Sequence, residues 1–253
     1  RAIPVSQLLD LIDDMSLSDL EFLISAAEVN VRAVERDLED PNARLGPTLN
    51  HLNGGNGLTA PRARAQAMSG AAAEARMTGG LVPVMAIAGS GNHGIANFLG
   101  VYGLAQGLGV SRERLARALA IASTVTVCVK AHTGKLTAFC GCAIAPATGL
   151  AAAAVDMLDG DADAREHAMQ SVVGVFAGML CDGAKESCAF KVNTAVSAAI
   201  DIAAQTVDGA FVPNNNGVVG TTIDETFARL ARLNDPGMRE TERVVLEFIA
   251  PAD

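Results

Sequence analysis

The sequence predicts a compact all-α protein, and three features carry this prediction. Helix-start signals recur along the chain, and apolar residues follow them at helical spacing. Half of the 253 residues are hydrophobic, yet only one Tyr, eight Phe and no Trp occur, so alanine and glycine supply much of the apolar character. Only two brief segments, 81–87 and 124–129, are strand candidates. The core is therefore expected to consist of helices whose backbones approach closely.

The first strong helix signal lies near the N-terminus. Ser18 and Glu21 have the spacing of a capping box, in which the two residues satisfy each other's backbone N–H groups. Apolar residues then recur at helical spacing as far as Asp40-Pro41, where proline is expected to end the helix.

A boundary between two regions is predicted near residue 58. Segment 42–58 is rich in glycine, asparagine and proline, and we expect it to be a loop. It separates an N-terminal helical hairpin and loop, residues 1–58, from a larger helical region, residues 59–253. That larger region opens with Thr59 as a helix cap and Pro61 just inside the first turn.

Similar signals predict the remaining helices. Ser111, Asp163 with Glu166, and Thr222 with Glu225 are the expected caps of three of them, and Asp235-Pro236 is expected to start the last. The other expected helices cover residues 61–77, 94–104, 135–158 and 188–206.

Composition excludes several classes of protein. The net charge is −9 and the 19 basic residues are dispersed, so no nucleic-acid surface is expected. The apolar stretch 143–158 contains Pro146, Gly149 and Asp156, which makes it too short and too weakly hydrophobic to span a membrane. Five cysteines in a chain this long predict free thiols in a reducing, cytoplasmic compartment rather than a disulfide scaffold.

The cysteines are the first candidates for chemistry. Cys181 and Cys188 bracket a short polar segment with Gly183, which can curl round a metal. Cys140 and Cys142 are expected on one helix, where positions two apart face different ways, so only one of them could join the pair. Three thiolates round a cubane cluster would leave one iron open as a Lewis acid. On spacing alone, cysteines buried as small core residues explain the pattern better, and a zinc site also competes.

A glycine-rich helix start is the second candidate. Its backbone N–H groups could hold a carboxylate, although a plain turn is the more frequent explanation. His93 is more often a structural residue than a general base. The expected substrate-binding residues are Ser90, Gly91, Asn92, His93 and Gly94.

Four segments together resemble a known family. They are Ala75-Arg76-Met77, Gly89-Ser90-Gly91-Asn92-His93-Gly94-Ile95, Lys135-Leu136-Thr137-Ala138-Phe139-Cys140 and Gly178-Met179-Leu180-Cys181-Asp182-Gly183-Ala184-Lys185-Glu186-Ser187-Cys188-Ala189. Their order resembles the L-cysteine desulfidase family, relatives of the alpha chain of iron–sulfur L-serine dehydratases. The resemblance runs from about residue 62 to the end of the chain.

This resemblance implies a [4Fe-4S] cluster held by Cys140, Cys181 and Cys188. The first ligand in the family follows a basic-Leu-Ser/Thr-Ala-apolar stretch, which selects Cys140 and leaves Cys142 as a packing residue. Cys128 matches no motif. Glutamine commonly stands in the family where this chain has His93.

The implied activity is elimination from a small amino acid, most simply L-cysteine to pyruvate, ammonia and sulfide. His93 and Lys130 are the candidate bases, and Lys130, Asn215 and Asn216 are further candidate substrate contacts. L-serine dehydration and a non-catalytic iron–sulfur protein are the alternatives. Full-length relatives carry an N-terminal Gly-Cys-Thr-Glu-Pro segment absent here, so we expect the missing half of the enzyme as a partner. A homo-oligomer is a further expectation.

Overall fold

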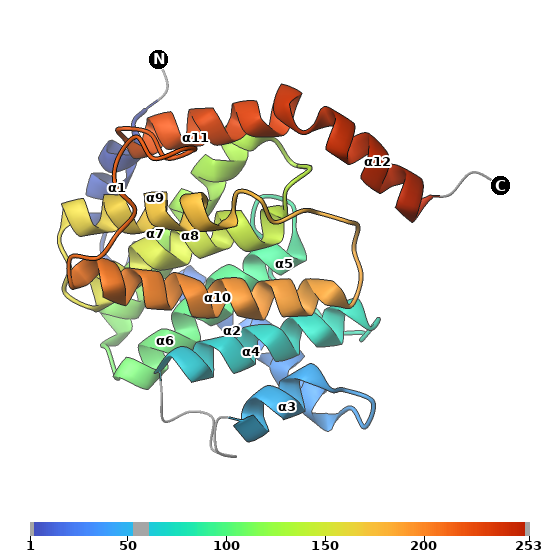
Figure 1. Cartoon of the computed structure of the whole chain (residues 1–253). Coiled ribbons are helices and arrows are strands. Elements are labelled where there is room, and N and C mark those ends of the chain that lie inside the picture. The colour runs from blue at the N-terminus through green and yellow to red at the C-terminus, as the bar shows by residue number, and fades with distance from the viewer. Residues whose placement is uncertain (1–2, 53–60, 251–253) are drawn as a thin grey trace.

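The computed structural model describes residues 3–52 and 61–250, and the regular secondary structure of this part of the chain is helical. It contains no strand, only two isolated β-bridges (Figure 1). The all-α prediction is therefore confirmed. In chain order, the helices and the two π-helical segments η1 and η2 are α1 Val5–Asp13, α2 Leu17–Glu39, α3 Leu45–Leu52, α4 Pro61–Met77, α5 Gly91–Gly94, η1 Ile95–Leu99, α6 Gly100–Leu108, α7 Arg112–Thr133, α8 Gly141–Met157, α9 Ala162–Phe176, α10 Ser187–Val207, α11 Ile223–Arg232, η2 Leu233–Gly237 and α12 Arg239–Ile249.

Helix α8 forms the centre of the core. It is rich in alanine and buried along nearly its whole length, and it packs against α7, α9 and α10. Small residues make this possible: a β-carbon on Gly149 would lie 2.3 Å from the carbonyl oxygen of Ala122 on α7. The alanine-rich composition thus permits the close helix packing that the sequence predicts.

Helix α7 is the one described helix long and apolar enough to cross a membrane, judged by length and composition. It packs against α8, α2 and α1, and just over half of its most apolar window is buried inside the protein. These contacts are those of a core helix.

Two of the predicted helix starts are displaced by two residues. The cap of α2 is Ser16, whose hydroxyl and backbone both bond the carboxylate of Asp19, so the predicted box of Ser18 and Glu21 is wrong. The cap of α9 is Asp161 instead of Asp163. Both helix starts offer two cap-type residues two positions apart, Ser16 and Ser18 for α2 and Asp161 and Asp163 for α9, so residue type alone does not fix the capping position.

Of three further predicted helix starts, two are confirmed and one is displaced. Ser111 and Thr222 cap α7 and α11 with their hydroxyl oxygens, as predicted. The last helix, α12, begins after Met238, because Asp235-Pro236 belongs to the π-helical segment η2.

The expected loop 42–58 contains a helix, α3. Its first turn is held from outside, because the carboxylate of Glu74 on α4 accepts from the backbone N–H groups of Arg44, Leu45 and Gly46 at 2.7–3.1 Å. This long-range cap outweighs the local glycine and proline signals. Residues 53–58 and the predicted cap Thr59 lie outside the described residues, and α4 begins at Pro61 as predicted.

Neither strand candidate is a strand. Segment 124–129 lies within α7, and segment 81–87 has no regular secondary structure apart from a single bridge from Ile87 to Ser90. Apolar side chains of α1, α2 and α3 pack in the same core as those of α4 and α7. The division at residue 58 stays a prediction, and it has to accommodate this shared core.

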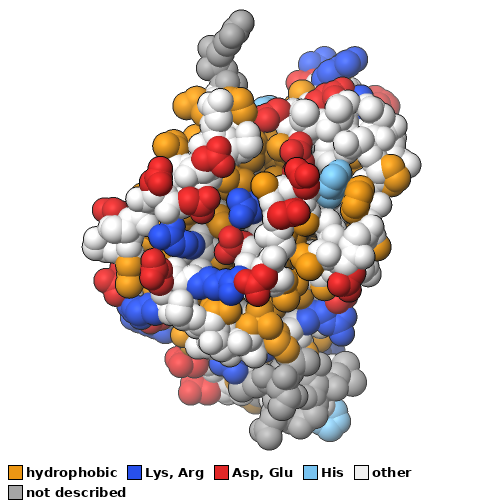
Figure 2. All heavy atoms as spheres, turned by 90° about the vertical axis from the view of Figure 1, so that its left-hand side faces the viewer, with side chains coloured by type: hydrophobic (Ala, Val, Ile, Leu, Met, Phe, Trp, Pro, Cys, Tyr) orange, Lys and Arg blue, Asp and Glu red, His pale blue; other side chains and the backbone are white. Residues whose placement is uncertain are grey.

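Charged side chains are dispersed over the face of the molecule drawn in Figure 2. Figure 2 shows one face on which acidic and basic side chains alternate with hydrophobic ones, and no basic stripe forms there. Helix α12 extends away from the body of the protein at its C-terminal end and has no buried residue (Figure 1). The thiols and the polar side chains that could take part in chemistry gather at the end of the bundle where α4 ends and α5, α8 and α10 begin.

Candidate active site

A short antiparallel contact brings two of the cysteines together. The backbone N–H of Cys140 donates to Met179 O at 2.5 Å, and that of Cys181 donates to Ala138 O at 2.8 Å. The segment before α8 is thereby fixed against the segment after α9. Sequence separation hides this pairing, since neither segment has the pattern of a strand.

Cys140 does not lie on a helix, which corrects the expected helix over 135–158. It is the N-cap of α8, with φ −69° and ψ 92°, and its side chain is buried. Cys142 lies in the first turn of α8 and lines the pocket described below, together with Cys181. The argument that a regular helix keeps Cys140 and Cys142 apart therefore fails, because only Cys142 has helical geometry.

The remaining thiol, Cys188, lies in the first turn of α10. Its Sγ contacts Gly183 O at 3.6 Å, across a turn in which Gly183 has φ +90°. Lys191, one turn further along α10, donates to Leu180 O at 2.8 Å and to Asp182 at 2.6 Å. These bonds hold the 181–188 segment in a curl, as its glycine and polar residues predict.

The four thiols form one electrostatic group. Burial raises the pKa of Cys140 to about 12, and charge on Cys142 and Cys181 adds to this shift. Burial is also the main cause of the raised pKa of Cys142, to which Cys188 and Cys181 contribute. Cys128 stands apart on α7, where burial and the charge of Asp224 raise its pKa.

The candidate donors at this end of the bundle are thiols, the ligand type of iron–sulfur clusters. Among residues 3–52 and 61–250, no three His, Cys, Asp or Glu side chains lie close enough together to hold one metal ion. A cubane spaces its ligands more widely than one zinc does, and its ligands are thiolates. Neighbouring thiols on two loops and a helix start fit that requirement.

A pocket of about 450 Å³ opens in front of the thiols. No carboxylate lines it, although the chain as a whole carries a net charge of −9. The charged, polar or thiol side chains that line it include Arg76, Ser90, His93, Lys135, Cys142 and Cys181. The pocket is therefore electropositive and suited to an anionic ligand.

The predicted glycine-rich segment forms one wall of this pocket. Ser90 caps α5, its Oγ accepts from His93 N at 3.4 Å, and it lies 3.8 Å from the Sγ of Cys142. Three of the five N–H groups in segment 90–94 are already bonded within the turn. Those of Gly91 and Asn92 have no acceptor among the described residues.

Arg76 is a pocket residue that sequence reasoning did not single out. Its Nη1 donates to Asn92 Oδ1 at 3.0 Å, and its charge lowers the pKa of Cys142 against the effect of burial. A β-carbon on Gly91 would lie 2.6 Å from Arg76 Nε, so the absence of a side chain makes room for the guanidinium. The signal was present, because Arg76 belongs to one of the segments that carry the family resemblance.

His93 lines the pocket and Lys130 Nζ lies beside Gly141 of its lining, and each of the two residues is more than nine-tenths buried. Neither Lys130 Nζ nor His93 Nδ1 has a hydrogen-bond partner within the described part of the chain. Burial and the neighbouring charge of Lys130 lower the pKa of His93 to about 4, against the opposing effect of the backbone groups of Ile87 and Gly141 beside the ring. Burial also lowers the pKa of Lys130, while the nearby thiols oppose the shift.

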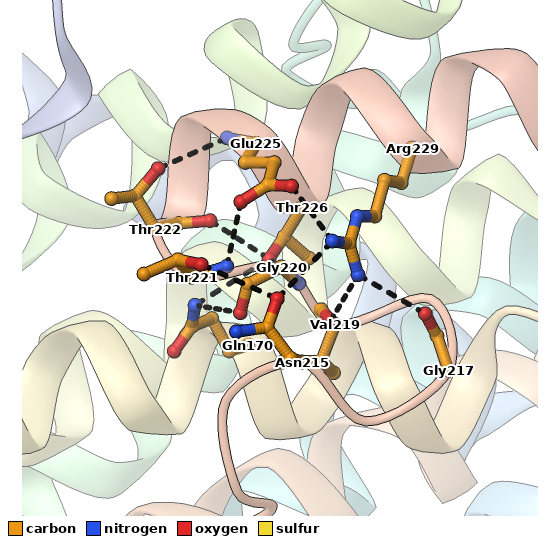
Figure 3. A network of polar contacts seen from close by, with 10 residues as sticks. All are labelled: Gln170, Asn215, Gly217, Val219, Gly220, Thr221, Thr222, Glu225, Thr226 and Arg229. Carbon is orange, nitrogen blue, oxygen red and sulfur yellow. Dashed lines mark hydrogen bonds and ion pairs between the residues drawn. The ribbon is translucent and has the colours of Figure 1, made fainter.

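Asn215 and Asn216 do not line this pocket. Asn215 accepts from Arg229 at 3.2 Å and from Thr221 at 3.3 Å, in a network that holds the loop before α11 (Figure 3). The backbone oxygen of Asn216 accepts from Val219 N. These hydrogen bonds hold the loop outside the lining of this pocket, and a substrate contact at Asn215 or Asn216 stays a prediction.

Fold and pocket together define a class: an all-α protein with neighbouring thiols in an electropositive pocket. The chain belongs to the serine dehydratase alpha chain family, which matches it over residues 12–247. This is a lyase-type family whose members generally bind an iron–sulfur cluster. The resemblance at this level is confirmed, whereas the L-cysteine desulfidase subfamily stays a prediction.

Three curated relatives similar to the chain are named only as UPF0597 proteins. A UPF0597 protein of Methanocella arvoryzae is 48% identical over 247 residues, covering 97% of this chain and 58% of that protein. Two more, from Desulforapulum autotrophicum and Desulfatibacillum aliphaticivorans, are 37% and 34% identical over 252 and 251 residues, each covering 98% of this chain and 57% of the relative. The chain thus spans less than three fifths of these relatives. No solved structure matches it.

Proposed function

We propose that the protein is the cluster-binding part of a lyase that eliminates a leaving group from a small amino acid, with L-cysteine as substrate. The observation that carries this proposal is the electropositive pocket, free of carboxylates and lined by thiols. Cys140, Cys181 and Cys188 are the proposed ligands of a [4Fe-4S] cluster. Cys142 is the competitor for the first position, because it lines the pocket more directly than Cys140.

When bound, the cluster supplies a Lewis acid for the leaving group. The chain's own residues do the rest. Arg76 and segment 90–94 orient an anionic substrate at one wall, and Lys135 adds positive charge. Loss of the Cα proton and of the Cβ thiol from L-cysteine gives hydrogen sulfide and an eneamine, which water converts to pyruvate and ammonia. His93 and Lys130 are the described candidates for taking the proton.

Two other functions use the same site. With L-serine the leaving group is water instead of hydrogen sulfide. A non-catalytic iron–sulfur protein would keep the thiols and have no need for an electropositive pocket. The pocket therefore favours a lyase over a structural cluster protein.

The whole protein's activity extends the proposal beyond this chain. Relatives are longer, and we propose that the remaining segment contributes the acid–base group, in cis or as a separate chain. Supplying it should raise turnover by about 10²–10⁴, the usual effect of a lost acid–base group. A cytoplasmic location and assembly into a homo-oligomer belong to the same proposal.

One experiment tests the function. The chain is reconstituted anaerobically with iron and sulfide, with and without the remaining segment of a full-length relative, and pyruvate and sulfide are assayed with L-cysteine and L-serine. Pyruvate with sulfide from L-cysteine supports the proposal, and pyruvate from L-serine alone supports dehydration. A loaded two-part protein that makes no pyruvate from either amino acid would leave the non-catalytic alternative.

A further inference from the structure

Three polar side chains converge on the point where Gly141, the first residue of α8, would carry a side chain. A β-carbon built on Gly141 would lie 3.1 Å from Lys130 Nζ, 3.3 Å from His93 Nε2 and 3.3 Å from Thr137 Oγ1. These three come from α7, α5 and the segment before α8. An oxygen atom at that point would be within hydrogen-bonding reach of all three. Gly141, His93 and Thr137 also line the pocket, so the position opens onto it.

The ammonium group of Lys130 favours a negatively charged ligand at this position. Its side chain is 6% exposed, and its ammonium has no hydrogen-bond acceptor among residues 3–52 and 61–250. A buried ammonium without a hydrogen-bond acceptor is costly, since it has lost its water, and the thiols of Cys140, Cys142 and Cys181 offset this cost only in part. Water at the position could accept one bond but would add no negative charge. An anion would satisfy both.

We propose that this position binds one oxygen of the substrate's carboxylate, with Lys130 Nζ and His93 Nε2 as the donors. The inference rests on the proposed function only where it assigns the carboxylate to an amino acid. Thr137 Oγ1 donates to Phe139 O at 2.8 Å, so its hydroxyl bonds the ligand only by turning away from that carbonyl. The rest of a small molecule extends into the pocket of about 450 Å³.

The assignment also limits the catalytic roles. An ammonium that donates to a carboxylate has no lone pair, and neither has the Nε2 of an imidazole that donates its proton there. Lys130 and His93 are then binding residues, and the Cα proton goes to another group. This agrees with the proposal that the acid–base group lies in the remaining segment of the longer relatives.

Gly141→Ala tests the position, because its methyl group occupies the point where the oxygen would bind. The matched control is Gly178→Ala, whose β-carbon meets nothing within 4 Å and whose φ is not in the left-handed region. The probes are pyruvate and its neutral amide, pyruvamide, titrated calorimetrically into the anaerobically reconstituted full chain. Iron content and melting temperature are measured for each variant.

We expect the wild type to bind pyruvate at least about 10-fold more tightly than pyruvamide, the effect of one hydrogen bond to a charged group. Gly141→Ala should lose this preference, and Gly178→Ala should keep it. Lys130→Met, which retains the length of the side chain, should also lose it and serves if Gly141→Ala does not fold. Equal binding of the two probes by the wild type, or an unchanged preference in folded Gly141→Ala, overturns the inference.

The two proposals can fail separately. If the wild type prefers pyruvate and Gly141→Ala does not, but no elimination from L-cysteine or L-serine occurs even with the remaining segment, the binding position is supported and the proposed function is rejected. If Gly141→Ala makes pyruvate as well as the wild type does, the function is supported and the binding position is rejected.

Discussion

Arg229 and Lys130 are basic side chains in two regions of the same bundle, and they differ in what surrounds them. Arg229 donates to Val219 O at 2.7 Å, Asn215 Oδ1 at 3.2 Å and Glu225 at 2.7 Å (Figure 3). Lys130 has no acceptor in the described part of the chain. A cation with all these partners holds a loop in place, whereas a buried cation without one is placed for a ligand.

The largest effect expected at the pocket end is loss of the cluster. Cys181→Ser should abolish iron loading after anaerobic reconstitution and lower turnover by at least about 10²-fold, because the leaving group loses its electrophile. Visible absorption and iron content measure the first effect without reference to activity. Cys128→Ser is the control, since Cys128 lies apart from the other thiols on α7.

The same series decides between Cys140 and Cys142. We expect Cys140→Ser and Cys188→Ser to lose iron as Cys181→Ser does, and Cys142→Ser to keep it. Loss of iron in Cys142→Ser with normal loading in Cys140→Ser would show that the first ligand is Cys142, in the first turn of α8, instead of Cys140. Normal iron loading in Cys181→Ser would contradict the cluster site as a whole.

A buried carboxyl extends the comparison to acidic groups. Asp37 on α2 is 1% exposed, and burial, Glu74 and Asp40 raise its pKa from 3.8 to about 7, while Arg36 lowers it. The folded state therefore holds this proton more tightly than the unfolded chain. Its contribution to stability is complete below about pH 4 and is lost as the pH rises through 7, by about 4 kcal/mol in total.

Asp37→Asn should remove most of that pH dependence, because the amide stays neutral and can still donate to Glu74. Urea unfolding between pH 4.5 and pH 8 measures the free energy of unfolding in each variant. Glu28→Gln is the control: it removes a carboxylate from an exposed position of the same helix. A wild type whose stability is flat or rises over this range, relative to Asp37→Asn, would show that Asp37 is ionised in the fold.

Sequence patterns predicted what depends on local chemistry. The helical class, the caps Ser111 and Thr222, and the start of α4 at Pro61 follow from residues adjacent in the chain. Helix α3 was missed because its N–H groups are satisfied by Glu74, about thirty residues away. No local pattern encodes such a contact.

The same distinction between local patterns and long-range contacts applies to the candidate site. The curl at 181–188 and the helix start at 90–94 are local, and sequence reasoning found both. The position of Cys140 outside α8 depends on pairing with residue 179, and the convergence on Gly141 depends on three separate segments. Arg76 and Thr137 were within the segments of family resemblance, but their roles appear only when these segments are assembled in space.

The smallest expected effect separates the two cations directly. Arg229→Met should lower the free energy of unfolding by about 1–3 kcal/mol, since it leaves the carbonyl of Val219 and the amide of Asn215 without their donor. Lys130→Met should leave stability unchanged or raise it slightly, because it replaces an unpaired buried ammonium by an apolar side chain of similar length. Urea unfolding at pH 7 of the protein without added ligand measures both.

Arg232→Met is the control, a basic residue at the end of α11 that has no ion pair in the described structure. If Lys130→Met destabilises the protein as much as Arg229→Met, then Lys130 has a structural partner and is not reserved for a ligand. If it leaves stability intact and removes the preference for pyruvate over pyruvamide, binding and folding are separate at this site. The two lysine measurements together decide the comparison, because a structural role and a binding role predict opposite pairs of results.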